Sequence, residues 1–269
     1  MTDAGPSAER PTAAGIYDVY LGGSDNTESE RAAAERLRQV LPYAADSAWA
    51  NRSFHQKATR WLAEQGITQF IDLGAGLPTQ DNTHQVVHRV APEARVVYVD
   101  HEDRTVTRAQ ELIANLPTVR FVKGDIRDVD GVLNDPALRE IIDFDQPVAL
   151  LCTAIVHFVD ERDDPWGVVD GYVKPLAPGS YLALTHLTAD KQSPKVLRTI
   201  NDVYRNANEM IHLRNRDQVE WFFRGLQLVP PYEGAPPKVT FVGLWGCEDP
   251  KEADDDSGRW LYCGVARKP

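Results

Sequence analysis

One stretch, residues 69–79 with the sequence QFIDLGAGLPT, constrains the fold of this chain more than any other. Its apolar first half is typical of a short buried strand, and Asp72, Gly74 and Gly76 form a series that predicts a turn at its carboxyl end. Glycine adopts positive φ without strain and lets a ligand approach closely, because it has no Cβ. The pattern predicts the first strand of a doubly wound sheet with a nucleotide-like ligand above it, although a GxG can also be an ordinary tight turn.

Three further apolar segments predict a parallel sheet. Residues 95–100 and 119–125 each end in a carboxylate, and residues 147–153 are almost wholly apolar, as a central parallel strand should be. Asp100 follows Gly76 at the distance of one strand-helix-strand unit. A carboxylate at that place can accept hydrogen bonds from both hydroxyls of a ribose.

The position of a third glycine separates two classes of nucleotide-binding fold. Dinucleotide-binding folds have GxGxxG, in which the third glycine lets helix and strand pack closely under a pyrophosphate. Here that position is Thr79, preceded by Pro78. A nicotinamide-dependent oxidoreductase is therefore disfavoured but stays an alternative.

The DxGxG motif followed by Asp100 and Asp125 resembles the class I S-adenosylmethionine-dependent methyltransferases. The resemblance implies an α/β, Rossmann-like fold with a seven-stranded, mostly parallel sheet, and S-adenosylmethionine as cofactor. It places the methionine part at Gly74 and Gly76, the ribose at Asp100 and the adenine at Asp125 with Ile126. The cofactor-binding residues it implies from the first strand onward are Asp72, Gly74, Ala75, Gly76, Asp100, His101, Asp125, Ile126, Thr153 and Ala154.

The N-terminal part carries a narrower resemblance. GIYDVYLGGSDN at residues 15–26 and ANRSF at residues 50–54 are similar to an uncharacterised actinobacterial family of S-adenosyl-methyltransferase-like proteins that open with IYDxxLGGxDN. The similarity continues through DLGAGLPT to the closing YCGVARKP, so it covers nearly the whole chain. Because that family has no settled substrate, the resemblance implies fold and cofactor more than it implies the acceptor.

In class I methyltransferases the element before the first strand commonly closes over the cofactor. The resemblance thus divides the chain into an N-terminal tail and helical lid, residues 1–45, and a methyltransferase domain, residues 46–269. Candidates for covering the methionine carboxylate or the acceptor are Tyr17, Gly23, Asn26 and Arg52.

Helical patterns flank the first strand and recur in the last third of the chain. A helix is expected over residues 46–65, with Trp49, Phe54 and Trp61 on its apolar side, where Arg52 could equally form a surface ion pair. Further helices are expected over residues 28–41, 81–90, 127–142, 193–208 and 216–224. The helix over residues 127–142 is expected to break at residues 134–136. Strands are expected over residues 239–245 and 260–266.

A histidine after the fourth strand is the candidate catalytic residue. AIVHFV, residues 154–159, occupies the place where class I enzymes bring the chain under the reactive methyl group, so the resemblance makes His157 a general base or an acceptor-orienting group. An imidazole titrates near neutral pH, which suits removal of a proton from an acceptor. The alternative is a structural histidine, because positioning alone can drive methyl transfer. His186, at the end of the fifth strand, is a second candidate.

Composition limits the partners. The net charge of −11 argues against a nucleic-acid backbone and favours a small-molecule acceptor. His84 and His88 lie four residues apart, but residue 85 is Gln and no third ligand stands out, so they are expected to pack on a helix and no metal is expected.

Cysteine usage and hydropathy predict a cytoplasmic protein without a membrane partner. Cys152, Cys247 and Cys263 lie in strand-like runs and suggest reduced, buried thiols. No apolar stretch approaches about 18 residues, and the polar residues 1–12 predict a mobile tail without a signal peptide.

The sequence therefore predicts an S-adenosylmethionine-dependent methyltransferase that acts on a small molecule. A non-catalytic S-adenosylmethionine-binding regulatory protein is the other alternative. Such a protein would keep Asp100 and Asp125 but tolerate loss of His157.

Overall fold

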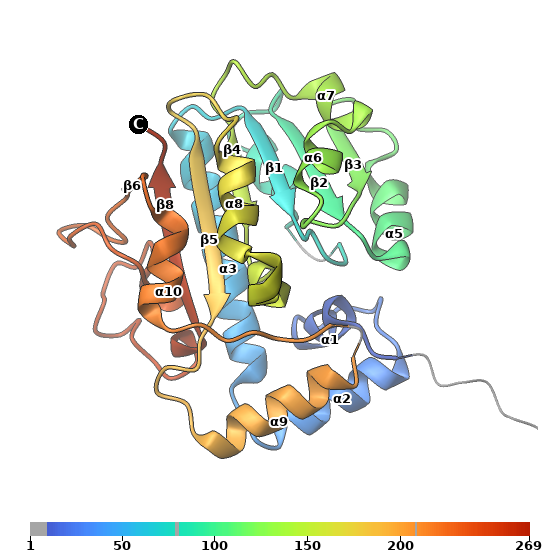
Figure 1. The fold of residues 1–269 in the computed structure, drawn as a ribbon, viewed down its shortest axis with the longest axis vertical. Helices are drawn as coiled ribbons and strands as arrows, with labels where there is room; N and C mark the ends of the chain where they lie inside the picture. The colour runs from blue at the N-terminus through green and yellow to red at the C-terminus, as the bar shows by residue number, and fades with distance from the viewer. Residues whose placement is uncertain (1–9, 79–80, 208) are drawn as a thin grey trace, which may run out of the picture.

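The computed structural model describes residues 10–78, 81–207 and 209–269. Within them the chain forms an eight-stranded sheet in the order β3-β2-β1-β4-β5-β8-β6, with β7 also paired to β8 (Figure 1). The strands are β1 (Gln69–Leu73), β2 (Arg95–Asp100), β3 (Val119–Lys123), β4 (Ala149–Cys152), β5 (Tyr181–Leu187), β6 (Gln227–Leu228), β7 (Thr240–Phe241) and β8 (Leu261–Arg267). β1 to β5 are parallel, and β8 is antiparallel to β5.

The α/β fold with a mostly parallel sheet is confirmed. The described residues contain eight strands where seven were expected, because the short strands β6 and β7 pair with different ends of β8. Strand order reverses between β1 and β4, so the loops after these strands diverge at their carboxyl ends. This switch point is where open α/β sheets bind ligands.

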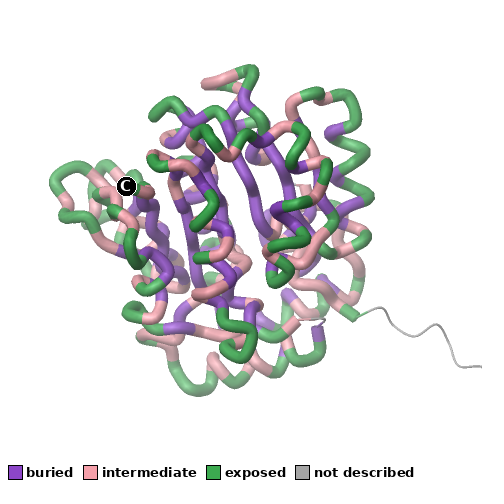
Figure 2. The backbone as a smooth tube through the Cα atoms, turned by 45° about the horizontal axis from the view of Figure 1, so that its top comes forward, coloured by how far each residue is buried: buried purple, intermediate pink, exposed green. Residues whose placement is uncertain are grey.

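Helices cover both faces of the sheet, and the central strands are buried along their length (Figure 2). One face packs against α6 (Val129–Leu133), α7 (Pro136–Ile141), α8 (Pro165–Val173) and α10 (Arg216–Glu220). The other packs against α3 (Ala44–Glu64), α4 (Thr83–His88) and α5 (Asp103–Ile113). Burial on both faces explains why the parallel strands are continuously apolar.

A third helical group lies across the carboxyl ends of the strands (Figure 1). It consists of α1 (Ala13–Tyr20), α2 (Glu28–Arg38) and α9 (Pro194–Arg205), joined through Ile16, Leu37 and Ile200. We call residues 12–38, which contain α1 and α2, the lid. The expected mobile tail falls mainly on residues 1–9, outside the described residues, whereas Thr12 already caps α1.

Several expected elements are shorter in the structure. The strand expected over residues 239–245 ends at Phe241 and continues as a 3₁₀ turn, Val242–Leu244. Val242 and Trp245 are both buried, a three-residue spacing that fits a turn and not a strand. The helix over residues 216–224 becomes a 3₁₀ turn after Glu220, and Asn208, the expected end of α9, lies outside the described residues.

The buried face of α3 differs from the prediction. Phe54 is buried in it, but Trp49 is 44% exposed. The buried face of α3 instead includes Ser47, Asn51 and His55, which are spaced four residues apart. Polar residues occupy this face because it meets a cavity, as described below.

The three cysteines are free thiols. Cys152 and Cys263 are buried as expected, whereas Cys247 is only partly buried. In the described part of the chain, no helix is both long and apolar enough to cross a lipid bilayer.

Candidate functional site

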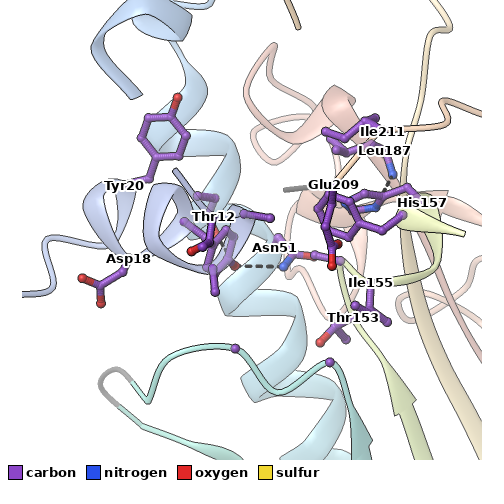
Figure 3. A pocket seen from close by; sticks show the side chains of 18 of the residues that line it. Thr12, Asp18, Tyr20, Asn51, Thr153, Ile155, His157, Leu187, Glu209 and Ile211 are labelled. Atoms are coloured by element: carbon purple, nitrogen blue, oxygen red, sulfur yellow. Dashed lines mark hydrogen bonds between the residues drawn. The ribbon is translucent and has the colours of Figure 1, made fainter. Parts of the chain in front are cut away.

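A cavity of about 230 Å³ lies between the carboxyl ends of the central strands and the lid. The turn after β1, residues 74–77, lines one end, and side chains from α1, α2 and α9 line the other. Figure 3 shows side chains of α1 on one side and those following β4 on the other, with Asn51 of α3 between them. The cavity therefore joins the predicted cofactor turn to the lid.

The glycine turn is held by the neighbouring strand. Gly74 and Ala75 donate backbone hydrogen bonds to the Val99 carbonyl at 2.8 and 3.1 Å. Gly74 has φ +70°, and a Cβ there would lie 2.3 Å from Ile155. Gly76 has φ +64°, and a Cβ there would meet nothing within 4 Å. The turn thus needs glycine for its conformation and leaves open space beside Gly76.

The Asp100 carboxylate is fixed next to this turn. Its Oδ2 accepts a hydrogen bond from the Gly76 amide at 2.9 Å, and its Oδ1 accepts one from the Glu102 amide at 3.0 Å. A carboxylate oxygen can accept more than one hydrogen bond, so both retain capacity for a ligand. The side chain is oriented before any ligand arrives.

A buried polar chain connects β1 to the end of β4 through α3. Thr83 Oγ1 donates to Asp72 Oδ2 at 2.6 Å and lies 2.8 Å from His55 Nε2. His55 Nδ1 lies 2.9 Å from Thr153 Oγ1. Because Thr83 donates to Asp72, it accepts from Nε2, and Nδ1 accepts from Thr153. Burial lowers the pKa of His55 to about 3 and raises that of Asp72 to about 6.

A second chain crosses from the lid to the sheet. Asn51 Nδ2 donates to the Tyr17 hydroxyl at 2.9 Å, and Tyr17 donates to the Ala48 carbonyl at 3.0 Å. Thr185 Oγ1 donates to Asn51 Oδ1 at 2.7 Å and accepts from the Ala154 amide at 2.7 Å. This chain fixes Tyr17 relative to the end of β4.

Arg52 lines the cavity and contacts the loop before α4. Its Nη2 donates to the Asp81 carbonyl at 3.1 Å and to Asn82 Oδ1 at 3.4 Å. The guanidinium therefore binds a loop beside the glycine turn and holds a positive charge at the cavity edge.

Gly23 and Asn26 lie outside the cavity lining and shape the loop after α1. Asn26 Nδ2 donates to Asp18 Oδ2 at 2.9 Å and to the Gly23 carbonyl at 2.8 Å. A Cβ at Gly23 would lie 1.9 Å from Asp18 Oδ1. These two residues support Asp18, which does line the cavity.

Asp125 and Ile126 also lie outside the lining. Asp125 forms an ion pair with Arg127 at 2.5 Å, and this hydrogen bond lowers the pKa of Asp125. Ile126 is buried, and its carbonyl accepts a hydrogen bond from Tyr172 at 3.0 Å. Their adenine contact stays a prediction.

His101 lines the cavity beside Asp100 and is bound by an acid from the segment after α9. His101 Nε2 lies 2.7 Å from Glu209 Oε1. This hydrogen bond raises the pKa of His101 to about 9, so the imidazole carries a positive charge at pH 7.

His157 lies in the 3₁₀ turn Val156–Phe158 and lines the cavity, although it is buried. Its Nδ1 accepts a hydrogen bond from the Leu187 amide at 3.5 Å. Burial, followed by nearby His186 and Arg214, lowers its pKa well below the usual value. The ring is thus neutral at pH 7 with its proton on Nε2, which suits a hydrogen-bond donor better than a general base.

Arg214 holds the turn that carries His157. It is fully buried, and its Nη2 donates to the Val159 carbonyl at 2.9 Å. Its Nη1 lies 2.8 Å from His186 Nε2, while His186 Nδ1 lies 2.7 Å from the Leu187 carbonyl. Both nitrogens of His186 are therefore occupied, and this second candidate lies outside the cavity lining.

His84 and His88 pack on their helix as expected. His84 Nδ1 lies 2.8 Å from the Tyr98 hydroxyl, and His88 Nε2 lies 2.9 Å from the Ala94 carbonyl. Among the described residues, no group of three His, Cys, Asp or Glu side chains could hold a metal ion.

Most of the predicted site residues meet at the cavity. Those that line it are Tyr17, Arg52, Asp72, Gly74, Ala75, Gly76, Asp100, His101, Thr153, Ala154 and His157. Thr79, at the third-glycine position, lies outside the described residues. Sequence reasoning missed Asn51, His55 and Glu209, although Asn51 lies in the ANRSF block.

Comparison with known proteins supports a common family. A family model described as S-adenosyl methyltransferase matches residues 4–269. A DUF574 family protein from Streptomyces avermitilis is 36% identical, with a TM-score of 0.89, over 97% of this chain and 98% of that one. A candidate methyltransferase from Thermobifida fusca is 35% identical, with a TM-score of 0.88, over 99% of each chain. No curated protein matches this sequence.

Proposed function

Because this chain belongs to the S-adenosyl methyltransferase family and uses S-adenosylmethionine, we propose that it methylates a small molecule bound between the lid and the strand ends. One observation carries the proposal: a single cavity joins the glycine turn and Asp100 to side chains of the lid and α9. The net charge of −11 disfavours a nucleic-acid acceptor.

The residues at the strand ends fit the cofactor. The open space at Gly76 admits a ligand to the backbone, and Asp100 offers two oriented acceptor oxygens for ribose hydroxyls. Asp72 supplies a carboxylate for an ammonium group. When bound, S-adenosylmethionine supplies an electrophilic methyl group on a sulfonium.

The protein's contribution at the acceptor is positioning. Tyr17 and Asn51 are locked by the hydrogen-bond chain to Thr185, and His157 holds a proton at Nε2. These groups orient an acceptor without needing to remove its proton at neutral pH. His157 is therefore proposed as an orienting residue.

Titration calorimetry with S-adenosylhomocysteine and NAD tests the cofactor site. Micromolar binding of S-adenosylhomocysteine without binding of NAD is expected. Transfer of a radiolabelled methyl group from S-adenosylmethionine to a member of a small-molecule library, but not to oligonucleotides, tests the acceptor class. Methylation of oligonucleotides alone would contradict the proposal.

A further inference from the structure

The end of the cavity beside α2 and α9, which lie away from the carboxyl end of β1 in Figure 1, is apolar. We call it the apolar chamber; its residues are Tyr20, Leu37, Leu41, Ile200, Tyr204 and Ile211. They come from α1, from α2 and the loop after it, and from α9 and the segment after it. Tyr20, Leu37 and Ile200 are each less than a tenth exposed. Buried apolar side chains therefore form much of the chamber wall.

Charge is distributed unevenly around the cavity. Among the described lining residues, those contributed by α2 and α9 carry no charge. The other charged lining residues lie on different elements: Asp18 on α1, Arg52 on α3, Asp72, Asp100 and Glu102 at the strand ends, and Glu209, which is paired with His101. A charged group placed in the apolar chamber would thus lose its water, and the six described side chains that form the chamber offer it no ionic partner.

The two tyrosine hydroxyls of the chamber differ in their hydrogen bonding. Tyr20 donates to the Ala34 carbonyl at 3.2 Å, whereas the hydroxyl of Tyr204 has no hydrogen-bond partner among the described residues. The Tyr204 ring lies 6.2 Å from the ring of Phe158, next to His157. The chamber therefore offers one neutral polar group on an otherwise apolar wall.

We infer that the methyl acceptor is an uncharged, mainly apolar molecule whose apolar body occupies the chamber and whose single reacting polar group faces Tyr17, Asn51 and His157. This inference rests on the proposed function. It specifies the substrate class, because anionic and cationic molecules of the same size would be excluded by the cost of desolvating their charge.

Fragments of matched shape and different charge test it. The protein is saturated with S-adenosylhomocysteine, and binding of 2-naphthol and 4-propylphenol is compared with that of 6-hydroxy-2-naphthoate, 3-(4-hydroxyphenyl)propanoate and tyramine by ligand-observed NMR. We expect the neutral fragments to bind at least about tenfold more tightly than the charged ones. Equal or tighter binding of the charged fragments, or no binding of either neutral fragment, would overturn the inference.

Variants that fill the chamber, with a matched surface variant as control, locate the binding. Ile200→Trp fills the chamber and should abolish binding of 2-naphthol while leaving S-adenosylhomocysteine affinity within about threefold, since α9 lies away from the carboxyl end of β1 (Figure 1). Arg198→Trp, at an exposed position of the same helix, should change neither and serves as the control. Ala44→Leu, a smaller filling change at a half-buried lining position, replaces Ile200→Trp if that variant does not fold. Unchanged 2-naphthol binding in the folded filling variant would overturn the inference.

The two proposals fail in different ways. Wild-type protein that does not bind S-adenosylhomocysteine would contradict the cofactor site. Protein that binds S-adenosylhomocysteine but shows no preference for neutral fragments would contradict only the acceptor class.

Discussion

Asp100 is the residue whose role follows most directly from its geometry. Backbone amides of Gly76 and Glu102 hold its two oxygens, so the carboxylate is positioned without any contribution from a ligand. Preorganised acceptors lose little freedom when they bind. A change at Asp100 should therefore appear mainly as lost affinity.

Asp100→Ala should weaken S-adenosylhomocysteine binding by about 2–4 kcal/mol, because two hydrogen bonds to a charged acceptor are lost together. Calorimetry measures this as a loss of tens to hundreds of fold. Asp103→Ala, which removes an exposed acid paired with Lys123, is the control and should bind normally. Unchanged affinity in folded Asp100→Ala would remove this residue from the site.

His157 distinguishes positioning from proton removal. His157→Ala should leave S-adenosylhomocysteine affinity within a few fold and lower turnover by about 10²-fold or more. His157→Gln should recover most of the loss, since an amide still donates a hydrogen bond. Burial holds the pKa of His157 far below neutrality. The wild-type rate should therefore not change with titration of His157 between about pH 6 and 8. A rise in the wild-type rate near pH 6.5 that is absent in His157→Gln would identify His157 as a general base instead.

Asp72 should give cofactor binding a pH dependence. Burial raises its pKa from 3.8 to about 6, so the folded protein favours the protonated acid. The contribution of this preference to folding stability is fully present below about pH 3.8 and is lost as pH rises through about 6. An ammonium group binds the ionised form, so affinity for S-adenosylhomocysteine should rise between about pH 5 and 7. Calorimetry across this range should show the rise in wild type but not in Asp72→Asn. The same pH dependence in both proteins would contradict the role.

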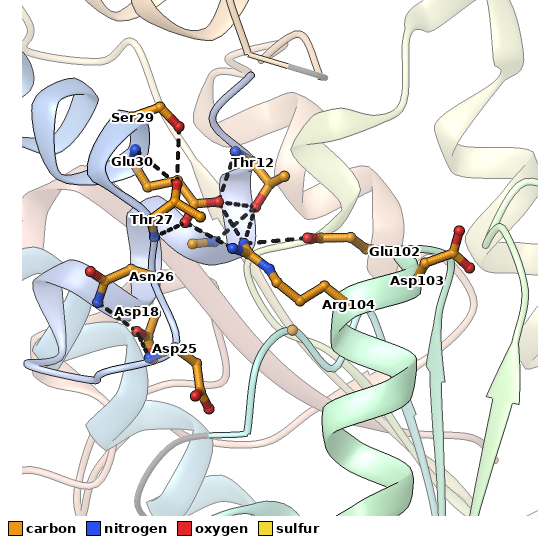
Figure 4. Close-up of polar contacts among 12 residues, drawn as sticks. Thr12, Asp18, Asp25, Asn26, Thr27, Ser29, Glu30, Glu102, Asp103 and Arg104 are labelled. Atoms are coloured by element: carbon orange, nitrogen blue, oxygen red, sulfur yellow. Dashed lines mark hydrogen bonds and ion pairs between the residues drawn. The ribbon is translucent and has the colours of Figure 1, made fainter. Parts of the chain in front are cut away.

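At the scale of elements, the lid is tied to α5 by an ion pair between a buried glutamate and a partly exposed arginine (Figure 4). Glu30 of α2 is buried, and Arg104 donates to its Oε1 at 2.5 Å and to its Oε2 at 3.2 Å. Thr12 donates to Glu30 at 2.7 Å and accepts from Arg104 at 3.1 Å. Burial alone would raise the pKa of Glu30, but these hydrogen bonds outweigh it and lower the pKa to about 2. This stabilisation is present above about pH 4.5 and is lost as pH falls toward 2.

Arg104→Met should loosen the lid, because it removes the cation from the buried Glu30 carboxylate, to which only the hydrogen bonds from Thr12 and Thr27 remain, at a cost of about 1.5–3 kcal/mol. Hydrogen exchange over residues 15–26 should become faster in this variant. In wild type, exchange over the same residues should slow when S-adenosylmethionine is added, since closure removes those amides from local opening. Arg60→Met, which breaks an exposed pair with Glu64, is the control. Unaltered exchange in Arg104→Met would show that packing alone holds the lid.

The elements also show where sequence reasoning succeeds. Apolar runs ending in Asp72 and Asp100 predicted the parallel strands, because a strand buried on both faces is a continuous apolar segment of the sequence. The buried face of α3 carries Asn51 and His55, so its polar residues resemble a solvent-exposed face. Helical periodicity alone therefore placed Trp49 on the wrong side.

At the scale of the whole molecule, the cavity is a product of tertiary packing. Leu37 is more than 160 positions from Ile200 and Glu209 in the sequence, and these residues line one cavity only because α2 and α9 pack together over the strand ends. No local pattern marks such a surface. The motif residues at the glycine turn were predictable because a backbone conformation requires them, whereas the apolar chamber could be recognised only after the fold had assembled it.

An experimental structure with bound S-adenosylhomocysteine is the most direct test of whether one end of the cavity holds the cofactor and the other end the acceptor. The predicted result places the ribose hydroxyls within hydrogen-bond distance of Asp100, with the sulfur facing His157 and the apolar chamber left open. A ligand whose ribose lies away from Asp100, or whose adenine fills the chamber beside Ile200, would contradict the account.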